Sequence, residues 1–255
     1  ENEKWAGAID EAGERLDHSF EPGREPARRP GILVLLGHGV TGNKDRPVLV
    51  DTARALNEAG FDTLRFSFSG NGDSGGRFVD STITKEVSDL DAVLEAASKT
   101  YPQIVYIGHS MGAAVGVIKA AEDRRINALV SLAGMVDTEA FARTEFGEPD
   151  NPPPCMWDEP DCPLSKAFMK DLCETIGTVM PQVSEVSVPW LLVHGSADDV
   201  VLPGDSEGVK AARGDAVTLV SVEGADHSFS EPKQKAEQVR AVVDWLKARF
   251  PQVKS

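Results

Sequence analysis

The chain has 255 residues, and its 26 Lys and Arg against 41 Asp and Glu give a formal net charge of −15. This acidity argues against nucleic acid and anionic membrane surfaces as partners, and the apolar runs are far shorter than a membrane span. The length suits a single domain over residues 1–255. No signal peptide is visible, although the chain begins at Glu1 rather than Met, and we therefore expect a cytoplasmic protein. We also expect a monomer or a homodimer.

Hydrophobic patterns typical of strands and of helices alternate along the chain. They predict strands at residues 5–9, 15–20, 32–36, 62–69, 104–107, 127–132, 189–193 and 216–222. They predict helices at residues 47–59, from Ser81 or Thr82 onward, after residue 110, and at 232–249. The alternation predicts an α/β fold with a mostly parallel sheet covered by helices on both faces.

Residues 136–187, between the sixth and seventh predicted strands, are too long for an ordinary connection. We expect them to form a cap or lid, with one amphipathic helix that has Leu164, Phe168, Leu172 and Ile176 on one face. Residues 137–185 include eleven acidic and three basic side chains, which indicates a solvated outer face or, alternatively, a lid that disfavours anionic substrates. An odd number of cysteines favours free thiols, with a Cys155–Cys162 bridge as the alternative. The cysteines are Cys155, Cys162 and Cys173.

The sequence QIVYIGHSMGAAVG at residues 103–116 places a G-x-S-x-G motif between a predicted strand and a predicted helix. A serine on so sharp a turn has a strained backbone, and Gly108 and Gly112 leave the space that the turn needs. The turn holds the Ser110 hydroxyl at the positive end of a helix, where an oxyanion is favoured. We interpret Ser110 as a nucleophile; a glycine-rich turn with a solvated serine is the structural alternative.

A serine hydroxyl is a poor nucleophile until a base takes its proton. His227 lies in GADHSF, a loop between the last predicted strand and the final helix, and such a loop can carry an imidazole over the carboxyl edge of the sheet. His109 is too near the turn to fold back onto Ser110, so we interpret it as packing. His227 is therefore the predicted base.

A base of this kind needs a carboxylate to orient it. Asp198 and Asp199 follow a predicted strand in HGSADDVV, and Asp198 is the favoured residue. Two other carboxylates are weaker candidates, Asp137 and Asp226. The order Ser110, Asp198, His227 matches the nucleophile, acid, histidine order of one group of serine hydrolases.

Acyl transfer also needs two N–H donors for the developing oxyanion. One is expected from the backbone of Met111, the residue after the nucleophile. The other is expected from Val40, with Thr41 as the near alternative, in the loop GHGVTGNKD that follows a predicted strand. Glycines at positions 37, 39 and 42 let this backbone approach a substrate closely.

Two stretches, GHGVTG and GNGDSG, also satisfy the G-x-G-x-x-G pattern of dinucleotide-binding proteins. The acidic residue expected at the end of the next strand is missing, because that strand ends in Phe68 and Ser69. The chain has no phosphate-binding Gly-Lys-Ser/Thr sequence, and its cysteines lack metal-ligand spacing. We expect no cofactor and no metal.

The motifs HGVTG, GHSMG, HGSADDVV and GADHSF together resemble the α/β-hydrolase superfamily, from about Arg15 to the end of the chain. HGVTGNKD and GNGDSGG are most similar to small-lid cinnamoyl and feruloyl esterases, with monoacylglycerol lipases more distant. Val40 departs from that group, in which a larger apolar or aromatic residue often follows His-Gly. The resemblance implies a sheet of about eight strands, a lid over the serine, no cofactor, and His38 as a structural histidine that braces the oxyanion loop.

The sequence therefore predicts a serine esterase that acts through an acyl-enzyme on small-molecule esters of small to medium acyl or aromatic acids. An amidase, peptidase or thioesterase on the same three residues is the alternative, and a dinucleotide-binding oxidoreductase or an inactive binding protein is a remote one. The acyl pocket is expected to be lined from the cap; plain packing inside the cap is the equal alternative for the same side chains. These are Met156, Trp157, Phe168, Met169 and Leu172.

Overall fold

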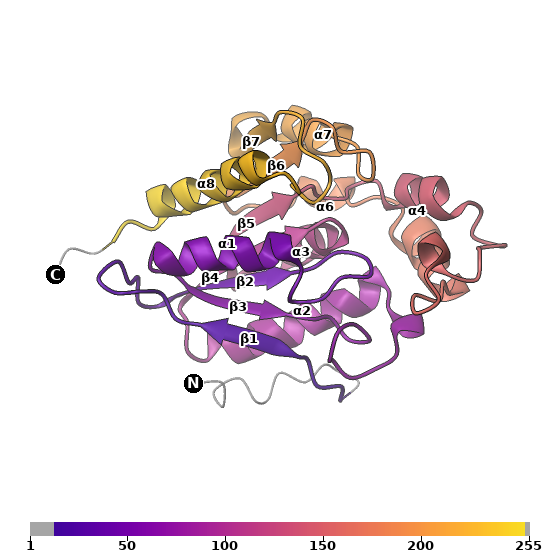
Figure 1. Cartoon of the computed structure of the whole chain (residues 1–255), viewed down its shortest axis with the longest axis horizontal. Coiled ribbons are helices and arrows are strands. Elements are labelled where there is room, and N and C mark those ends of the chain that lie inside the picture. Colours follow the sequence, from indigo (N-terminus) through magenta and orange to yellow (C-terminus); the bar gives the residue numbers. More distant parts are fainter. Residues whose placement is uncertain (1–12, 253–255) are drawn as a thin grey trace.

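The computed structural model describes residues 13–252, and its strands form one sheet (Figure 1). Along the sheet the order is β1-β3-β2-β4-β5-β6-β7, with β1 antiparallel to β3 and every other neighbouring pair parallel. The strands are β1 His18–Glu21, β2 Ile32–Gly37, β3 Asp62–Phe66, β4 Gln103–His109, β5 Ile126–Leu132, β6 Trp190–Gly195 and β7 Val217–Val222. These are the seven strands of the described residues. The strand predicted at 5–9, which would bring the sheet to the expected eight, lies outside them.

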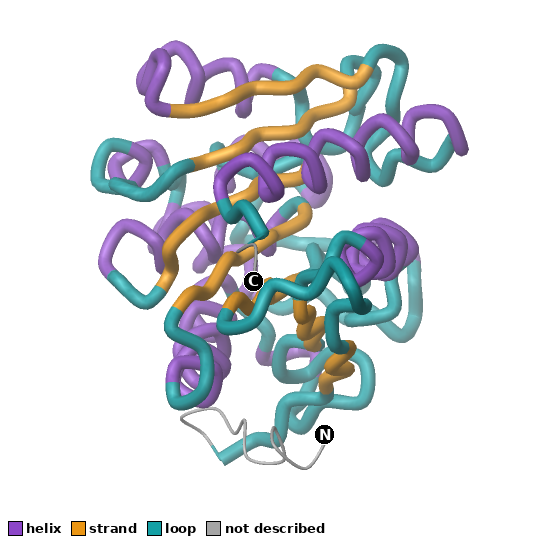
Figure 2. Tube along the Cα trace, turned by 90° about the vertical axis from the view of Figure 1, so that its left-hand side faces the viewer, coloured by secondary structure: helices purple, strands orange, loops and turns teal. Residues whose placement is uncertain are grey.

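Helices cover both faces of the sheet, as the alternating patterns predicted (Figure 2). Helices α1 and α8 pack together on one face and lie in front of the sheet in Figure 1, while α2 and α3 pack behind it. The main helices are α1 Pro47–Glu58, α2 Ile83–Ser98, α3 Met111–Glu122, α7 Gly204–Arg213 and α8 Pro232–Arg249. Within residues 13–252, no helix is long and apolar enough to cross a membrane.

The central strand β4 is buried on both faces, which explains why its sequence is apolar. Ile104 and Tyr106 contribute to the core beneath α2 and α3, whereas Val105 and Ile107 contribute to the core beneath α1 and α8. Successive side chains of a strand point to opposite faces, so a strand that is covered on both sides needs an apolar residue at every position. The prediction of a doubly covered parallel sheet is confirmed.

Several element boundaries differ from prediction for local reasons. The cap of α2 is Thr82, one of the two residues predicted for it, because the Thr82 side chain accepts a hydrogen bond from the Lys85 N–H. Strand β3 ends at Phe66 instead of residue 69, since the Ser69 N–H and hydroxyl both bind the Asp89 carboxylate. Strand β1 begins at His18, three residues later than expected.

The inserted segment (residues 133–189) joins β5 to β6 and lies beyond the carboxyl ends of the central strands, at the right of Figure 1. Its helical elements are α4 Thr138–Phe146, the 3₁₀ turn Met156–Asp158, α5 Lys166–Lys170, the π-helix Asp171–Ile176 and α6 Met180–Val183. The predicted single amphipathic helix is thus a short α-helix that continues as a π-helix. All three cysteines are free thiols, as expected.

Candidate active site

Ser110 lies at the turn between β4 and α3, at the carboxyl edge of the sheet. Its backbone angles, φ 55° and ψ −121°, are ones that a residue with a side chain rarely adopts. Hydrogen bonds on both sides hold this geometry: the Ser110 N–H donates to the Leu132 carbonyl, and the Ser110 carbonyl accepts from the Met135 N–H. A Cβ atom on Gly112 would lie 2.3 Å from the carbonyl oxygen of His38, so only glycine allows the turn to approach the loop after β2.

That loop passes directly beside Ser110. A Cβ atom on Gly39 would lie 2.7 Å from the Cβ atom of Ser110. The next residue, Val40, has an N–H for which the described part of the chain offers no acceptor. The N–H of Met111, at the start of α3, likewise has no acceptor inside the helix. Two unpaired backbone donors therefore flank the serine.

His38 holds the loop in place from inside the protein. Its Nε2 atom accepts a hydrogen bond from the Phe68 N–H, so the hydrogen of the neutral ring is on Nδ1, which donates to the Gly39 carbonyl at 2.8 Å. Burial lowers the pKa of His38 to about 4, with a smaller contribution from the charge of Arg46, and the ring stays neutral near pH 7. The arrangement agrees with the bracing role that the resemblance implied.

Asp198 and His227 meet at the carboxyl ends of β6 and β7. The Nδ1 atom of His227 lies 2.8 Å from Oδ2 of Asp198, while Oδ1 accepts from the N–H groups of Val200 and Val201. Burial alone would raise the pKa of Asp198, but hydrogen bonds from His194 and His227 outweigh it and hold that pKa well below its ordinary value. A fixed, ionised carboxylate thus orients the His227 ring and leaves its Nε2 atom available.

Two further histidines support this pair. His194 is buried, and its Nε2 atom lies 3.2 Å from Oδ2 of Asp198, the oxygen that His227 also contacts; its ring further binds Ser206 and the Val201 carbonyl. His109 lies against the His227 ring, with 4.9 Å between the ring centroids. Sequence analysis treated His109 as packing; the structure adds a hydrogen bond from its Nε2 to the His227 carbonyl.

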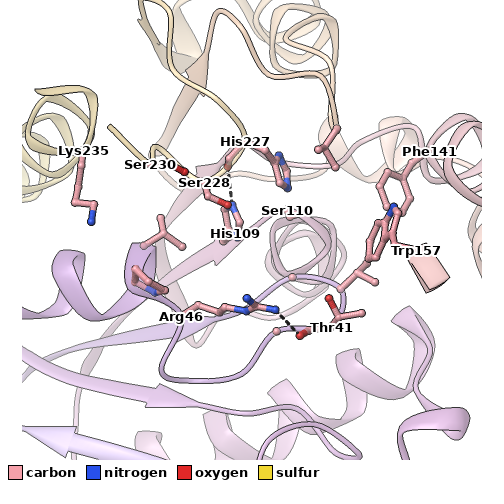
Figure 3. A pocket seen from close by; sticks show the side chains of 16 residues that line it. Thr41, Arg46, His109, Ser110, Phe141, Trp157, His227, Ser228, Ser230 and Lys235 are labelled. Carbon is pink, nitrogen blue, oxygen red and sulfur yellow. Dashed lines mark hydrogen bonds between the residues drawn. The ribbon is translucent and has the colours of Figure 1, made fainter. Parts of the chain in front are cut away.

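A cavity of about 490 Å³ opens at this edge of the sheet (Figure 3). Ser110 and His227 both line it, and within the described residues no direct hydrogen bond joins their side chains. Such contacts are often long in a ligand-free site and tighten when substrate binds. The rest of the wall comes from three parts of the chain. The loop after β2 contributes Gly39, Val40, Thr41 and Gly42, and the start of α1 contributes Arg46, Pro47 and Val48. Later parts of the chain contribute His109, Phe141, Trp157, Val200, Ser228, Ser230 and Lys235.

Comparison with known proteins places the fold and its local motifs in one superfamily. The family model described as "Serine aminopeptidase, S33" matches residues 28–146. Est1E from Butyrivibrio proteoclasticus, solved with bound ferulic acid, is 27% identical, with a TM-score of 0.84 over 96% of this chain and 99% of that one. The chain has the α/β-hydrolase fold.

More distant relatives of this α/β hydrolase include enzymes and an uncharacterised protein. The monoacylglycerol lipase of Paleococcus ferrophilus shares the fold at 19% identity, with a TM-score of 0.73 over 92% of this chain and 99% of that one. An uncharacterised protein of Mycobacterium tuberculosis is 26% identical over 220 residues, which are 86% of this chain and 70% of that protein. The structural relatives thus lie among the esterases and lipases of the superfamily.

The expected acyl pocket needs correction. Of its five residues only Trp157 lines the cavity of this α/β hydrolase, beside Phe141, which sequence analysis missed. The other four are at most 2% exposed and pack in the core beneath the inserted segment, because their apolar faces cover one another and the helices below. These four residues are Met156, Phe168, Met169 and Leu172.

The alternative carboxylates of the hydrolase lie elsewhere. Asp199 is exposed beside a small hollow of about 110 Å³, and Asp137 caps α4 by accepting from the Ala140 N–H. Asp226 is exposed and accepts from the Ser230 N–H. Between residues 13 and 252, no three His, Cys, Asp or Glu side chains gather in a way that could hold a metal ion. Arg46 and Lys235 carried no motif, so only the folded chain could bring them to the cavity.

Proposed function

We propose that this chain is a serine esterase in which Ser110, His227 and Asp198 form the catalytic triad. The observation that supports this most strongly is the 2.8 Å hydrogen bond between Asp198 and His227, at the edge of the cavity that the strained Ser110 also lines. A base that is oriented by a buried carboxylate, beside a serine on a sharp strand-to-helix turn, is the arrangement that acyl transfer requires.

The reaction would proceed in two halves. His227 takes the proton of the Ser110 hydroxyl, and Oγ attacks the ester carbonyl to form a tetrahedral oxyanion that the N–H groups of Val40 and Met111 stabilise. The carbon–oxygen bond to the alcohol breaks as His227 returns the proton to the leaving oxygen. Water then attacks the acyl-Ser110 ester by the same proton transfers and releases the acid. Asp198 fixes the His227 tautomer and stabilises the imidazolium.

The proposed substrates are esters of small to medium acyl or aromatic acids. Two aromatic side chains, Phe141 and Trp157, line the cavity from the inserted segment, which we propose acts as a cap on a single domain. Aromatic rings favour an aromatic acid that stacks on or against them. The ferulic acid in the Est1E structure is consistent with this preference.

Cleavage of amides is a second candidate, because the family model that matches residues 28–146 is described as a serine aminopeptidase. A panel of 4-nitrophenyl esters from acetate to palmitate, methyl hydroxycinnamates and a peptide amide separates the two. We expect hydrolysis of the shorter esters and the hydroxycinnamates; cleavage of the amide alone would favour the peptidase.

A fluorophosphonate probe tests the nucleophile independently of the substrate. We expect the probe to label Ser110, and Ser110→Ala to lose both labelling and turnover while its thermal unfolding stays near that of the original protein. Turnover that survives in Ser110→Ala would overturn the proposal, and so would labelling at another residue.

A further inference from the structure

The charge on the cavity wall is opposite in sign to the charge of the chain. The chain carries a net −15, yet among the described residues that line the cavity two are cationic and none is Asp or Glu. The acidic inserted segment contributes only the aromatic Phe141 and Trp157 to the wall. A partly enclosed group responds chiefly to nearby charges, because salt screens exposed charges beyond about 8 Å. The local cations therefore decide which ligands the cavity favours.

Arg46 is the stronger of the two cations. It is exposed, no Asp or Glu in the described part of the chain pairs with it, and its guanidinium donates one hydrogen bond, from Nη2 to the Thr41 carbonyl at 2.8 Å. The rest of the guanidinium is free to donate to a ligand, and its planar N–H groups suit the two oxygens of a carboxylate. Pro47 and Val48 follow it as the first residues of α1 and also line the cavity, so the positive end of that helix adds to the same field.

Lys235 carries the second positive charge to the cavity wall from the first turn of α8. Its ammonium forms an ion pair with Asp51 of α1 at 2.8 Å, and about one third of the side chain is exposed. Asp51 also pairs with Arg54, so its negative charge is shared between two cations. Lys235 therefore supplements Arg46 and does not replace it.

The cationic and aromatic parts of the wall lie on different sides of Ser110. Figure 3 shows Phe141 and Trp157 to the right of Ser110 and Lys235 to the left, with Arg46 below Ser110 and its guanidinium bonded to the Thr41 carbonyl. A general acid must reach the oxygen of the leaving alcohol, so the alcohol half of an ester lies toward His227. Lys235 follows His227 along the same loop and helix. Lys235 thus reaches the cavity from the side of the alcohol half, opposite the aromatic rings, and Arg46 lies between the two sides.

We propose that the preferred substrate is an ester whose alcohol half carries a carboxylate, which Arg46 binds with help from Lys235, and whose acyl half packs against Phe141 and Trp157. This inference rests on the proposed esterase function and specifies the substrate class of the same site. It replaces the expectation that the acidic segment repels anionic substrates, since those acidic side chains do not line the cavity.

The test compares two esters that differ only in charge on the leaving group, 4-(butanoyloxy)benzoate and 4-(butanoyloxy)benzamide. The measured quantity is the ratio of their kcat/KM values, anionic over neutral. We expect Arg46→Gln to lower this ratio about 5- to 10-fold, as loss of a charge-assisted hydrogen bond at a partly exposed site does. Arg46→Lys should keep most of the preference, and Arg46→Gln combined with Lys235→Gln should remove the remainder.

The Arg46 side chain also donates a hydrogen bond to the Thr41 carbonyl, so its loss can slow hydrolysis of both esters. The ratio of the two kcat/KM values separates this structural effect from recognition of the charge. Lys233→Gln is the matched control, since Lys233 lies in the same first turn of α8 and does not line the cavity. Rising salt should lower the ratio for the original protein, lower it less for Arg46→Gln, and leave it flat when Lys235→Gln is combined with Arg46→Gln.

A ratio that is equal in Arg46→Gln and the original protein would overturn the inference while leaving esterase activity in place. A preference for mono(4-nitrophenyl) glutarate over 4-nitrophenyl pentanoate that depends on Arg46 would also overturn it, because the carboxylate would then belong to the acyl half. Failure to hydrolyse any of the four esters would reject the proposed function, and the inference with it.

Discussion

The Nε2 atom of His109 lies 2.9 Å from the backbone carbonyl oxygen of His227, so the residue before Ser110 holds the loop that carries the proposed base. A carbonyl oxygen can only accept, and Nε2 of His109 must therefore carry a hydrogen. Burial, with a smaller effect from His227, lowers the pKa of His109 to about 3, which keeps the ring neutral near pH 7. The proposed nucleophile and base are thereby tied by a backbone contact as well as by their shared cavity.

Removal of this tie should reduce turnover without unfolding the protein. We expect His109→Ala to lower kcat about 10- to 100-fold, because displacement of a catalytic group by about 1 Å has effects of this size. His109→Gln should retain more activity, since its amide can still donate to the His227 carbonyl. Steady-state kinetics on a neutral ester, with thermal unfolding as the control for folding, measure both. An unchanged kcat in His109→Ala would contradict this reading of the contact.

The assignment of the acid is tested by two adjacent carboxylates. Asp198→Asn should lower kcat by about 10³- to 10⁴-fold, as in other serine hydrolases, because an amide in this position favours the wrong tautomer of the base. Asp199→Asn should change kcat less than about 2-fold, since Asp199 is exposed and outside the main cavity. Equal losses in the two variants would refute the choice of Asp198.

Acid should destabilise the protein through its buried histidines. The folded-state pKa values of His38 and His109 are about 4 and about 3, below the ordinary 6.5, so between these limits the unfolded chain binds more protons than the folded one. The contribution of these two histidines to the free energy of unfolding should be highest above pH 6.5 and fall toward pH 4, by at most about 1.4 kcal/mol per pH unit for each histidine. Urea unfolding at a series of pH values measures the slope, which His38→Gln should reduce.

Glu86 should change the dependence of the free energy of unfolding on pH in the direction opposite to that of the histidines. Burial, then the nearby charges of Asp89 and Asp171, raise its pKa well above 4.5, and its Oε2 atom has no hydrogen-bond partner among the described residues. A raised folded-state pKa means that the folded chain holds the extra proton, so stability falls as pH rises above 4.5. Glu86→Gln should remove this slope and add about 1 kcal/mol of stability near pH 8, because a buried charge is replaced by a neutral amide.

The control for Glu86→Gln is Glu95→Gln on the same helix, at a surface position that is paired only with Lys99. It should leave the dependence of unfolding on pH unchanged, since an exposed ion pair contributes little. A slope that is the same in Glu86→Gln as in the original protein would mean that Glu86 is ionised in the folded state.

The sheet and the turn at Ser110 could be predicted because their causes are local. A strand that is covered on both faces is apolar throughout, and a serine at a strained turn needs glycine on either side. The wall of the cavity could not be predicted from the sequence. A helical apolar pattern shows that one face of the helix is buried, but it does not show which residues cover that face. Phe168 and Leu172 pack inside the inserted segment, whereas Phe141 reaches the cavity from a part of that segment without a motif.

Trp157 lies in a short hairpin that closes on itself. The backbone of Met156 bonds to that of Cys162, Leu164 bonds to Pro154, and the Trp157 indole donates to the Glu145 carboxylate. None of these bonds involves the central sheet. Changes of length or sequence within the hairpin can therefore reshape the aromatic side of the cavity without a cost to sheet stability, while Ser110, Asp198 and His227 keep their positions at the edge of the sheet.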